Sequence, residues 1–295
     1  MRILLATDGS ESAAVARDLT ASLPWPDGSA IRVVAVVERP VGVIPTPWLA
    51  PGPANLGELY DDLVRSITAA LEAVERDLRR QGVTVDSVRR EGRAATGIVD
   101  EARAFGADLV ILGSRGHGPI ASMLIGSTSS EVVDHAPCPV LVARRAAIGP
   151  ILIADDGSPV SERAMQLLES WSPFADEPCG VLSVAEVAGP WIVGVAPTMY
   201  DDVLAAHAAD VEAAREQATA IASAGAERLR KAGFRAEAIT AEGDAAHRIL
   251  EAAKARGSGL IVLGSRGRTG IVRAMLGSVA RNVLLHADCS VMIVR

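Results

Sequence analysis

Gly113-Ser-Arg-Gly116-His-Gly-Pro-Ile-Ala-Ser-Met-Leu-Ile-Gly126-Ser127 follows the apolar run Asp108-Leu-Val-Ile-Leu112. The apolar run predicts a buried parallel strand, and residues 127–135 after the glycine-rich turn predict a helix. Where such a turn meets a helix, unpaired backbone N–H groups converge with the positive end of the helix dipole. The sequence therefore predicts an anion site there, and the expected anion is a phosphate.

The same stretch recurs 151 residues later as Gly264-Ser-Arg-Gly267-Arg-Thr-Gly-Ile-Val-Arg-Ala-Met-Leu-Gly277-Ser278. It again follows a strand-like run, at 259–263. Three aligned glycine matches have a chance frequency of roughly 3 in 10,000 per alignment, taking Gly as about 7% of residues. The chain is therefore an internal duplication, and we expect two domains, 1–146 and 147–295.

Apolar and amphipathic segments alternate in each half, and this alternation predicts an α/β fold with parallel strands. In the first half we expect strands at 3–7, 31–37, 83–90, 108–112 and 139–143, with helices from Ser10 or Ser12 to Leu23 and at 56–81, 95–105 and 127–135. In the second half we expect strands at 151–154, 181–187, 235–241, 259–263 and 291–294, with helices to Trp171 and at 202–231 and 245–256. The prediction is two tandem doubly wound five-stranded parallel-sheet domains, whose ligands lie at the carboxyl ends of the strands.

Composition excludes several classes of function. The net charge is −7, from 29 basic and 36 acidic residues, which argues against nucleic-acid and anionic-membrane partners. No apolar run reaches the ~18 residues of a membrane span, and Met1-Arg2 leads straight into Ile3 without a signal-peptide pattern. A cytoplasmic location is therefore expected. The three cysteines form no Cys-x-x-Cys pair and indicate neither a disulfide framework nor a zinc knuckle; the sequence assigns no metal ligands.

Two patterns make both halves resemble the universal stress protein family. Asp8-Gly9-Ser10 accompanies the first glycine motif, and Asp156-Gly157-Ser158 accompanies the second. The chain is similar to a tandem member of this family, with adenine nucleotide alpha hydrolase-like domains. The spacing Gly-x2-Gly-x9-Gly-Ser/Thr is typical of the ATP-binding branch. The resemblance therefore implies two ATP sites, with Mg²⁺ accompanying the nucleotide, in a nucleotide-dependent regulator or sensor of the stress response.

The resemblance also implies which residues bind the nucleotide. Asp8 and Asp156 would face the adenosine, with Val36 and Val184 near the adenine, and the glycine loops would hold the phosphates. The full expected set is Asp8, Gly9, Val36, Gly113, Arg115, Gly116, Gly126, Ser127 and Thr128 in the first half, and Asp156, Gly157, Val184, Gly264, Arg266, Gly267, Gly277, Ser278 and Val279 in the second.

Association is a further implication of the resemblance, because family members pair through their last strands. Residues 140–143 and 291–294 are thus expected to meet within one chain as a pseudo-dimer, and the linker at 144–150 is too short for a flexible tether. A homodimer of two chains and a protein partner of unknown identity stay open.

Each of these residues also has a simpler interpretation. Asp8 and Asp156 could serve only as turn or capping residues, and Arg115 and Arg266 could either fork onto phosphate or lie at the rim. The motif glycines could only permit turns, but their recurrence at positive-φ and close-approach positions favours phosphate binding. His135 and His286 stand at helix ends, where a histidine meets free carbonyls.

The sequence assigns no catalytic residue. It lacks a Gly-x4-Gly-Lys-Ser/Thr loop, and its only lysines, Lys231 and Lys254, lie outside both motifs, so ATP hydrolysis is expected to be slow at most. Asp8-Gly9-Ser10-Glu11-Ser12 also differs from the Ser-Gly-Gly-x-Asp-Ser of adenylating relatives. A slow ATPase switch and a nucleotide-free interaction scaffold are the alternatives to a regulator. Because the proline-rich loop at 39–55 is longer than its counterpart at 188–200, the two sites are expected to differ.

Overall fold

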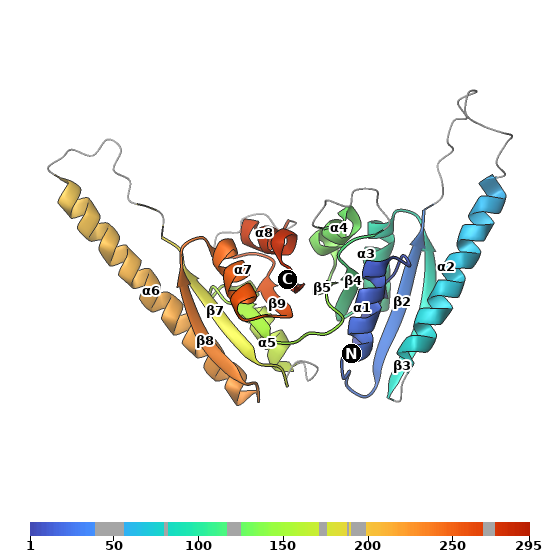
Figure 1. The fold of residues 1–295 in the computed structure, drawn as a ribbon, viewed down its shortest axis with the longest axis horizontal. Coiled ribbons are helices and arrows are strands. Elements are labelled where there is room, and N and C mark those ends of the chain that lie inside the picture. Colours follow the sequence, from blue (N-terminus) through green and yellow to red (C-terminus); the bar gives the residue numbers. More distant parts are fainter. Residues whose placement is uncertain are drawn as a thin grey trace, which may run out of the picture. The chain divides into compact units, whose positions relative to one another are not determined.

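The computed structural model describes residues 1–38, 56–79, 82–116, 125–170, 176–187, 189, 199–267 and 275–295, and of residues 56–59 the backbone alone. The expected loop at 39–55, most of the loop at 188–200, and Trp171 lie outside the described residues. The chain divides into two compact units, Met1–Ala147 (unit 1) and Ile148–Arg295 (unit 2). Figure 1 shows that each unit combines one sheet with its own helices.

Unit 1 is built on a parallel sheet with the strand order β3-β2-β1-β4-β5. Its elements are β1 (Arg2–Ala6), α1 (Glu11–Ser22), β2 (Ser29–Val37), α2 (Leu56–Leu78), β3 (Val83–Glu91), α3 (Ala94–Phe105), β4 (Leu109–Gly113), α4 (Ser127–His135) and β5 (Val140–Ala143). The chain runs outward from β1 to β3 and then returns to the other side of β1. This reversal makes the sheet doubly wound, as predicted.

Unit 2 repeats the arrangement with the strand order β10-β9-β6-β7-β8, again all parallel. Its elements are β6 (Ile151–Ala154), α5 (Pro159–Ser170), β7 (Cys179–Ala185), α6 (Tyr200–Lys231), β8 (Ala236–Glu242), α7 (Ala245–Ala255), β9 (Leu260–Gly264), α8 (Ser278–His286) and β10 (Ser290–Val294). The predicted α/β fold of two tandem five-stranded units is thus confirmed.

Helices cover both faces of each sheet, which explains the continuous apolar strands. In unit 1, α1 packs on β4 and β5 and contacts α2, while α3 packs on β1 and β2 and contacts α4. Every residue of β4 and β5 is buried. In unit 2, α5 and α6 contact each other, as do α7 and α8. The core of each unit therefore lies on both sides of its central strands.

Local signals place the helix ends. Ser10, one of the two expected caps, is the N-cap of α1, and its side chain accepts a hydrogen bond from the N–H of Ala13 at 3.2 Å. Gly106 ends α3 in the left-handed conformation, with a φ of +61°. The carboxylates of Glu38 and Glu186, just after β2 and β7, accept the first N–H of α3 and of α7, each at 2.9 Å. Both units therefore anchor α3 and α7 to a neighbouring strand end.

The structure differs from the sequence expectation at β7, which runs two residues earlier than 181–187. The chain leaves the sheet after Ala185, whose carbonyl accepts the N–H of Gly243, because Glu186 turns to cap α7. Glu186 and Val187, the last two residues of the expected strand, therefore lie beyond the ladder.

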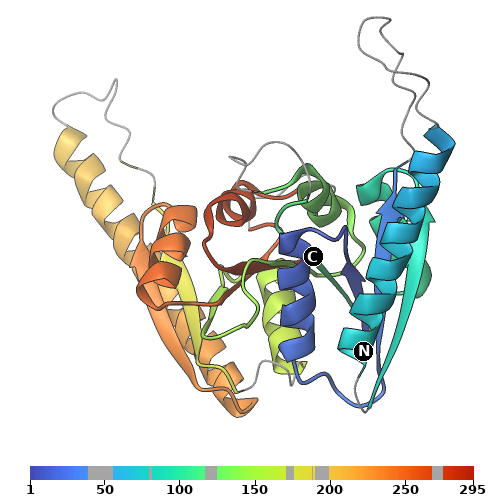
Figure 2. The same ribbon diagram turned by 45° about the vertical axis from the view of Figure 1, so that its right-hand side comes forward.

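The two long helices are buried over only part of their length. Of the predicted stripe on α2, Leu71, Val74 and Leu78 are buried, whereas Leu63 is 41% exposed. In α6 the first buried residue is Ala218, and Figures 1 and 2 show the preceding turns running past the end of β7 and β8. Within the described residues, no helix is long and apolar enough to cross a membrane.

Candidate functional site

The predicted site residues of unit 1 gather where the strand order reverses. β1 pairs with β2 on one side and with β4 on the other, although β2 and β4 are far apart in the sequence. Asp8 follows the carboxyl end of β1, and the glycine loop leaves the carboxyl end of β4 at Gly113. In open α/β sheets this reversal point opens the crevice in which ligands bind.

Unit 2 brings the equivalent residues to the equivalent point. Asp156 follows β6, and the second glycine loop leaves β9 at Gly264, which is the neighbour of β6 in the sheet. The duplication has therefore preserved the position of the loop in the fold as well as its sequence.

A backbone hydrogen bond closes the neck of each glycine loop. The N–H of Gly126 donates to the carbonyl oxygen of Ser114 at 2.7 Å, and the N–H of Gly277 donates to that of Ser265 at 2.8 Å. These two glycines are also the N-caps of α4 and α8, and neither supplies a side-chain cap. The first N–H groups of both helices are therefore available to an anion at the loop.

The first helical turns carry four of the predicted site residues. Ser127 and Ser278, the first residues of α4 and α8, are exposed, and Thr128 and Val279 behind them are half-buried. A ligand in solvent can therefore reach the first residue of each helix, next to the loop.

Close approach, rather than turn geometry, explains the motif glycines. A Cβ on Gly116 would lie 2.6 Å from Oδ2 of Asp8, and a Cβ on Gly267 would lie 2.7 Å from Oδ2 of Asp156. A Cβ on Gly113 would meet the backbone of Ser12 on α1. The glycines thus keep open the space between the loop and the Asp turn.

The expectation of positive φ at the glycine motif was wrong. None of its described glycines lies in the left-handed region. That conformation is found instead in the Asp-Gly-Ser turns, at Gly9 with a φ of +81° and at Gly157 with a φ of +73°. Both of these glycines are exposed, and each lets the chain turn from the first strand into the next helix.

The two aspartates serve the turn and also face the loop. Oδ1 of Asp8 accepts the N–H of Ser10 at 3.0 Å, and Oδ1 of Asp156 accepts the N–H of Ser158 at 3.0 Å. The second oxygen of each carboxylate points towards Gly116 or Gly267. In both aspartates, Oδ1 therefore serves the turn, as the simpler interpretation predicts. Oδ2 lies at the candidate site.

Val36 and Val184 lie on the far side of the first strand from the glycine loops. β1 ends beside Val34 and β6 ends beside Leu182, so each valine stands two residues beyond the last pair, level with Asp8 or Asp156. Both valines are half-buried. The side chain of Val36 packs against Gly97 on α3, which leaves no room for a Cβ there.

The two loop arginines differ. Arg115 is exposed, whereas Arg266 is half-buried and its Nε donates to the carbonyl oxygen of Met275 at 3.2 Å. The two arginines are equivalent in sequence, and the difference in their exposure is visible only in the structure.

Sequence reasoning missed two hydroxyls that hold the first loop. Ser12 Oγ accepts the N–H of Arg115 at 3.1 Å and donates to the carbonyl oxygen of the same residue. The buried Ser129 donates its hydroxyl to the carbonyl oxygen of Gly113 at 2.8 Å. Ser12 was visible only as a possible helix cap, and no sequence signal marked Ser129.

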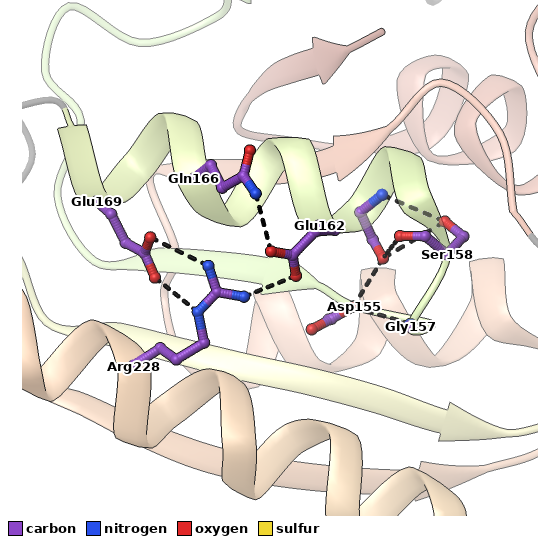
Figure 3. Close-up of polar contacts among 8 residues, drawn as sticks. Asp155, Gly157, Ser158, Glu162, Gln166, Glu169 and Arg228 are labelled. Carbon is purple, nitrogen blue, oxygen red and sulfur yellow. Dashed lines mark hydrogen bonds and ion pairs between the residues drawn. The ribbon is translucent and has the colours of Figure 1, made fainter.

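Unit 2 has a further carboxylate at its turn, Asp155. Its Oδ1 accepts the N–H of Gly157 at 2.9 Å (Figure 3). The same oxygen accepts the hydroxyl of Ser161 at 2.7 Å. Within the described ranges no three His, Cys, Asp or Glu side chains group as metal ligands. Through its two hydrogen bonds, Asp155 fixes the conformation of the turn.

An ion-pair network fixes α5, the helix that follows this turn. Arg228 on α6 donates to Glu169 at 2.9 Å and to Glu162 at 2.6 Å (Figure 3). The hydrogen bond from Arg228, supported by one from Gln166, lowers the pKa of Glu162 below its ordinary value. The network therefore ties the start and the end of α5 to α6.

Each unit is thus a doubly wound α/β unit with a glycine loop at the reversal of its sheet, and the chain is a tandem of two. The model of the universal stress protein family matches residues 1–144 and again residues 148–295. The chain therefore belongs to the universal stress protein family.

Individual relatives agree with this assignment. A universal stress protein of Mycobacterium tuberculosis is 30% identical over 276 residues, which cover 87% of this chain and 84% of the relative. A universal stress protein of Thermus aquaticus is 34% identical over 148 residues, covering 48% of this chain and 97% of the relative. The crystal structure of a universal stress protein from Archaeoglobus fulgidus is similar in fold, with a TM-score of 0.65 and 17% identity, covering 100% of this chain and 98% of that one.

Proposed function

We propose that each unit binds an adenine nucleotide, ATP with Mg²⁺, and that the chain is a cytoplasmic regulator of the stress response whose state depends on this nucleotide. The observation that carries the proposal is the duplicated loop at the reversal of each sheet. In both units an uncapped helix N-terminus, a loop closed at its neck and an aspartate turn meet at one point.

The chemistry of these groups fits a phosphate chain. Backbone N–H groups and the helix dipole favour a negative charge at Ser127 and Ser278. The glycines leave space that a Cβ would fill beside Asp8 and Asp156. Val36 and Val184 supply an apolar surface next to the aspartates, as an adenosine requires. The membership in the universal stress protein family adds support, because the glycine spacing is that of its ATP-binding branch.

A regulatory role is proposed rather than rapid catalysis. Neither motif contains a lysine, and fast phosphoryl transfer needs a positioned cation together with a group that orients the attacking water. Bound ATP would then act as a ligand that shifts the balance between two conformations or two partner affinities. A steady turnover above about 1 per second, within the ordinary range of enzymes, would contradict this role.

Charge placed at the helix N-terminus offers a direct test. Ser127→Asp and Ser278→Asp each put a carboxylate on an exposed first helical residue, where it favours the helix but repels phosphate. Titration calorimetry with ATP and Mg²⁺ should give one site per chain for each single variant and none for the double variant. Affinity at the altered unit should fall at least about a hundredfold, given the Coulomb energy of two close charges.

The matched control is Ser223→Asp, which adds the same charge to an exposed position of α6. It should leave both sites unchanged. Unchanged binding in Ser127→Asp and Ser278→Asp would refute phosphate binding at the loops. Phosphate release by Gly116→Ala and Gly267→Ala tests the ATPase alternative, because any slow hydrolysis at the loops should be lost in both.

A further inference from the structure

The two glycine loops share the sequence Gly-Ser-Arg-Gly but are held by different side chains. In unit 1, the second residue of α1 is Ser12, whose hydroxyl lies between the helix and the loop. It accepts the N–H of Arg115 at 3.1 Å and donates to the carbonyl oxygen of Arg115. Both backbone groups of one loop residue are therefore fixed by a single side chain.

A second hydroxyl fixes the loop of unit 1 from the other side. Ser129 is the third residue of α4, is buried, and donates to the carbonyl oxygen of Gly113 at 2.8 Å. Gly113 is the last residue of β4, where the loop begins. Ser12 and Ser129 thus tie the base of the loop to both of the helices that flank it.

Unit 2 has apolar residues at both of these positions. The second residue of α5 is Val160, and its Cγ1 lies against Gly264 as Ser12 lies against Gly113. The third residue of α8 is Ala280, which is buried. Because neither side chain can form a hydrogen bond, the loop of unit 2 lacks the three hydrogen bonds that the two serines make in unit 1.

The arginine of the second loop is also engaged within the loop. Arg266 donates from Nε to the carbonyl oxygen of Met275 at 3.2 Å, while Arg115 of unit 1 is exposed. A phosphate that recruits the Arg266 guanidinium must compete with this bond. Among the described residues, the second loop therefore lacks the hydroxyl bonds at its base, and its arginine must give up a hydrogen bond before it can contact phosphate.

We propose that the two nucleotide sites are unequal, with Ser12 and Ser129 acting as positioning residues that make unit 1 the tighter site. This inference rests on the proposed function. A loop held in its binding conformation loses less conformational freedom when the ligand arrives, so its affinity is higher. Hydrogen bonds of ordinary strength account for a difference of about tenfold between the sites.

Single-site variants allow the two affinities to be measured separately. Ser278→Asp leaves unit 1 to bind, and Ser127→Asp leaves unit 2. Titration with ATP and Mg²⁺ should give a dissociation constant about tenfold lower for unit 1. Equal constants, or a tighter unit 2, would overturn the inference while leaving the proposed function standing. Absence of binding by the unaltered protein would refute the proposed function itself.

Reciprocal exchange of the residues tests the cause. Ser12→Val in the unit 1 background should weaken ATP binding several-fold, and Val160→Ser in the unit 2 background should strengthen it. Ser12→Thr keeps the hydroxyl and should retain most of the affinity. An unchanged dissociation constant in Ser12→Val would overturn the assignment of Ser12.

A matched control separates positioning from general stability. Thr20 is buried in the same helix, and its hydroxyl donates to the carbonyl oxygen of Ala16 at 2.7 Å. Thr20→Val removes this hydrogen bond without touching the loop, so it should lower the melting temperature and leave the dissociation constant unchanged. A loss of affinity equal to that of Ser12→Val would overturn the positioning role.

Discussion

In both units an arginine pairs with a carboxylate on the outer strand of the sheet, but the arginine comes from a different element in each unit. In unit 1, Arg32 on β2 pairs with Asp86 on β3, directly opposite in the sheet. In unit 2 the position opposite Glu237 on β8 is Gly180 on β7, and the arginine comes from Arg256 at the end of α7. Both units therefore have an ion pair at this place in the sheet, but the arginine lies on a strand in unit 1 and at a helix end in unit 2.

Neighbouring residues have changed to suit each arrangement. Arg32 lies over the ring of Phe105 at the end of α3, 4.4 Å from the ring centre, a favourable contact of a cation with an aromatic face. In unit 2 the arginine itself stands at the end of the helix, and a Cβ on Gly180 would lie 3.0 Å from its Nε. Gly180 therefore makes room for a side chain that arrives from the helix.

Unit 1 has a buried carboxylate where the equivalent residue of unit 2 is an alanine. Glu101 on α3 is 1% exposed and binds both Arg32, at 3.1 Å, and Arg90, at 2.6 Å. The hydrogen bonds that Arg32 donates to Asp86 and Glu101 raise the pKa of Arg32 above its ordinary value, despite the opposing effect of burial. The equivalent residue of α7 is Ala252, so the comparison predicts that the charges of unit 1 are more tightly coupled.

The largest effect is expected at this buried carboxylate. Glu101→Gln should lower the free energy of unfolding of unit 1 by about 3 kcal/mol, because it removes the buried anion shared by the half-buried Arg32 and the exposed Arg90. Hydrogen exchange of the β2 and β3 amides measures the loss in unit 1 alone. Glu131→Gln, at a more exposed pair with Arg93, is the control and should cost less than about 1 kcal/mol. Equal losses of unfolding free energy in Glu101→Gln and Glu131→Gln would contradict the stronger coupling of charges inferred for unit 1.

Moving the arginine tests whether the two arrangements are interchangeable. Arg32→Gly should destabilise unit 1 by about 2 kcal/mol, since it removes the ion pairs and places a flexible glycine in a strand. Adding Phe105→Arg copies the arrangement of unit 2 and should recover about 1 kcal/mol of this loss. Denaturation of the single and double variants gives the coupling energy. Strictly additive losses would show that the second arrangement does not work in unit 1.

The smallest expected effect is the pH dependence of the α5 network in unit 2. Arg228 lowers the pKa of Glu162 in the folded state, so the ionised carboxylate stabilises unit 2 above the ordinary pKa of 4.5. This contribution is lost as the pH falls through the lowered pKa. Because Glu162 is 47% exposed, it amounts to less than about 1 kcal/mol. Stability measured from pH 6 to pH 3 should depend less on pH in Arg228→Gln; an unchanged profile would contradict the assignment.

The order of strands and helices was predictable because buried parallel strands are short apolar runs and the glycine motif recurs. The end of β7 at Ala185 was not predictable from the sequence, because it depends on the contact of Glu186 with a helix 59 residues further along the chain. The stripe on α2 predicted an amphipathic helix correctly, but periodicity does not tell how far a sheet extends beneath it. Burial therefore stops short of Leu63.

The candidate site was predictable in its positions and less so in its support. The sequence placed the loops and aspartates at one end of the sheet, because parallel strands share their carboxyl edge. It did not reveal Ser12, whose partner Arg115 lies 103 residues away, nor Ser129. Contacts over such separations arise from packing, which no local pattern records. The binding roles of the site residues stay a prediction until ligand is measured.

The most direct test of the account is the number of ATP molecules that the unaltered chain binds. Protein stripped of nucleotide would be dialysed to equilibrium against ATP and Mg²⁺, and bound nucleotide counted per chain. We expect two bound molecules at saturation, with unit 1 filling at lower ATP concentrations than unit 2. Binding of none at concentrations near 1 mM, the weak end of ordinary ligand affinity, would contradict it.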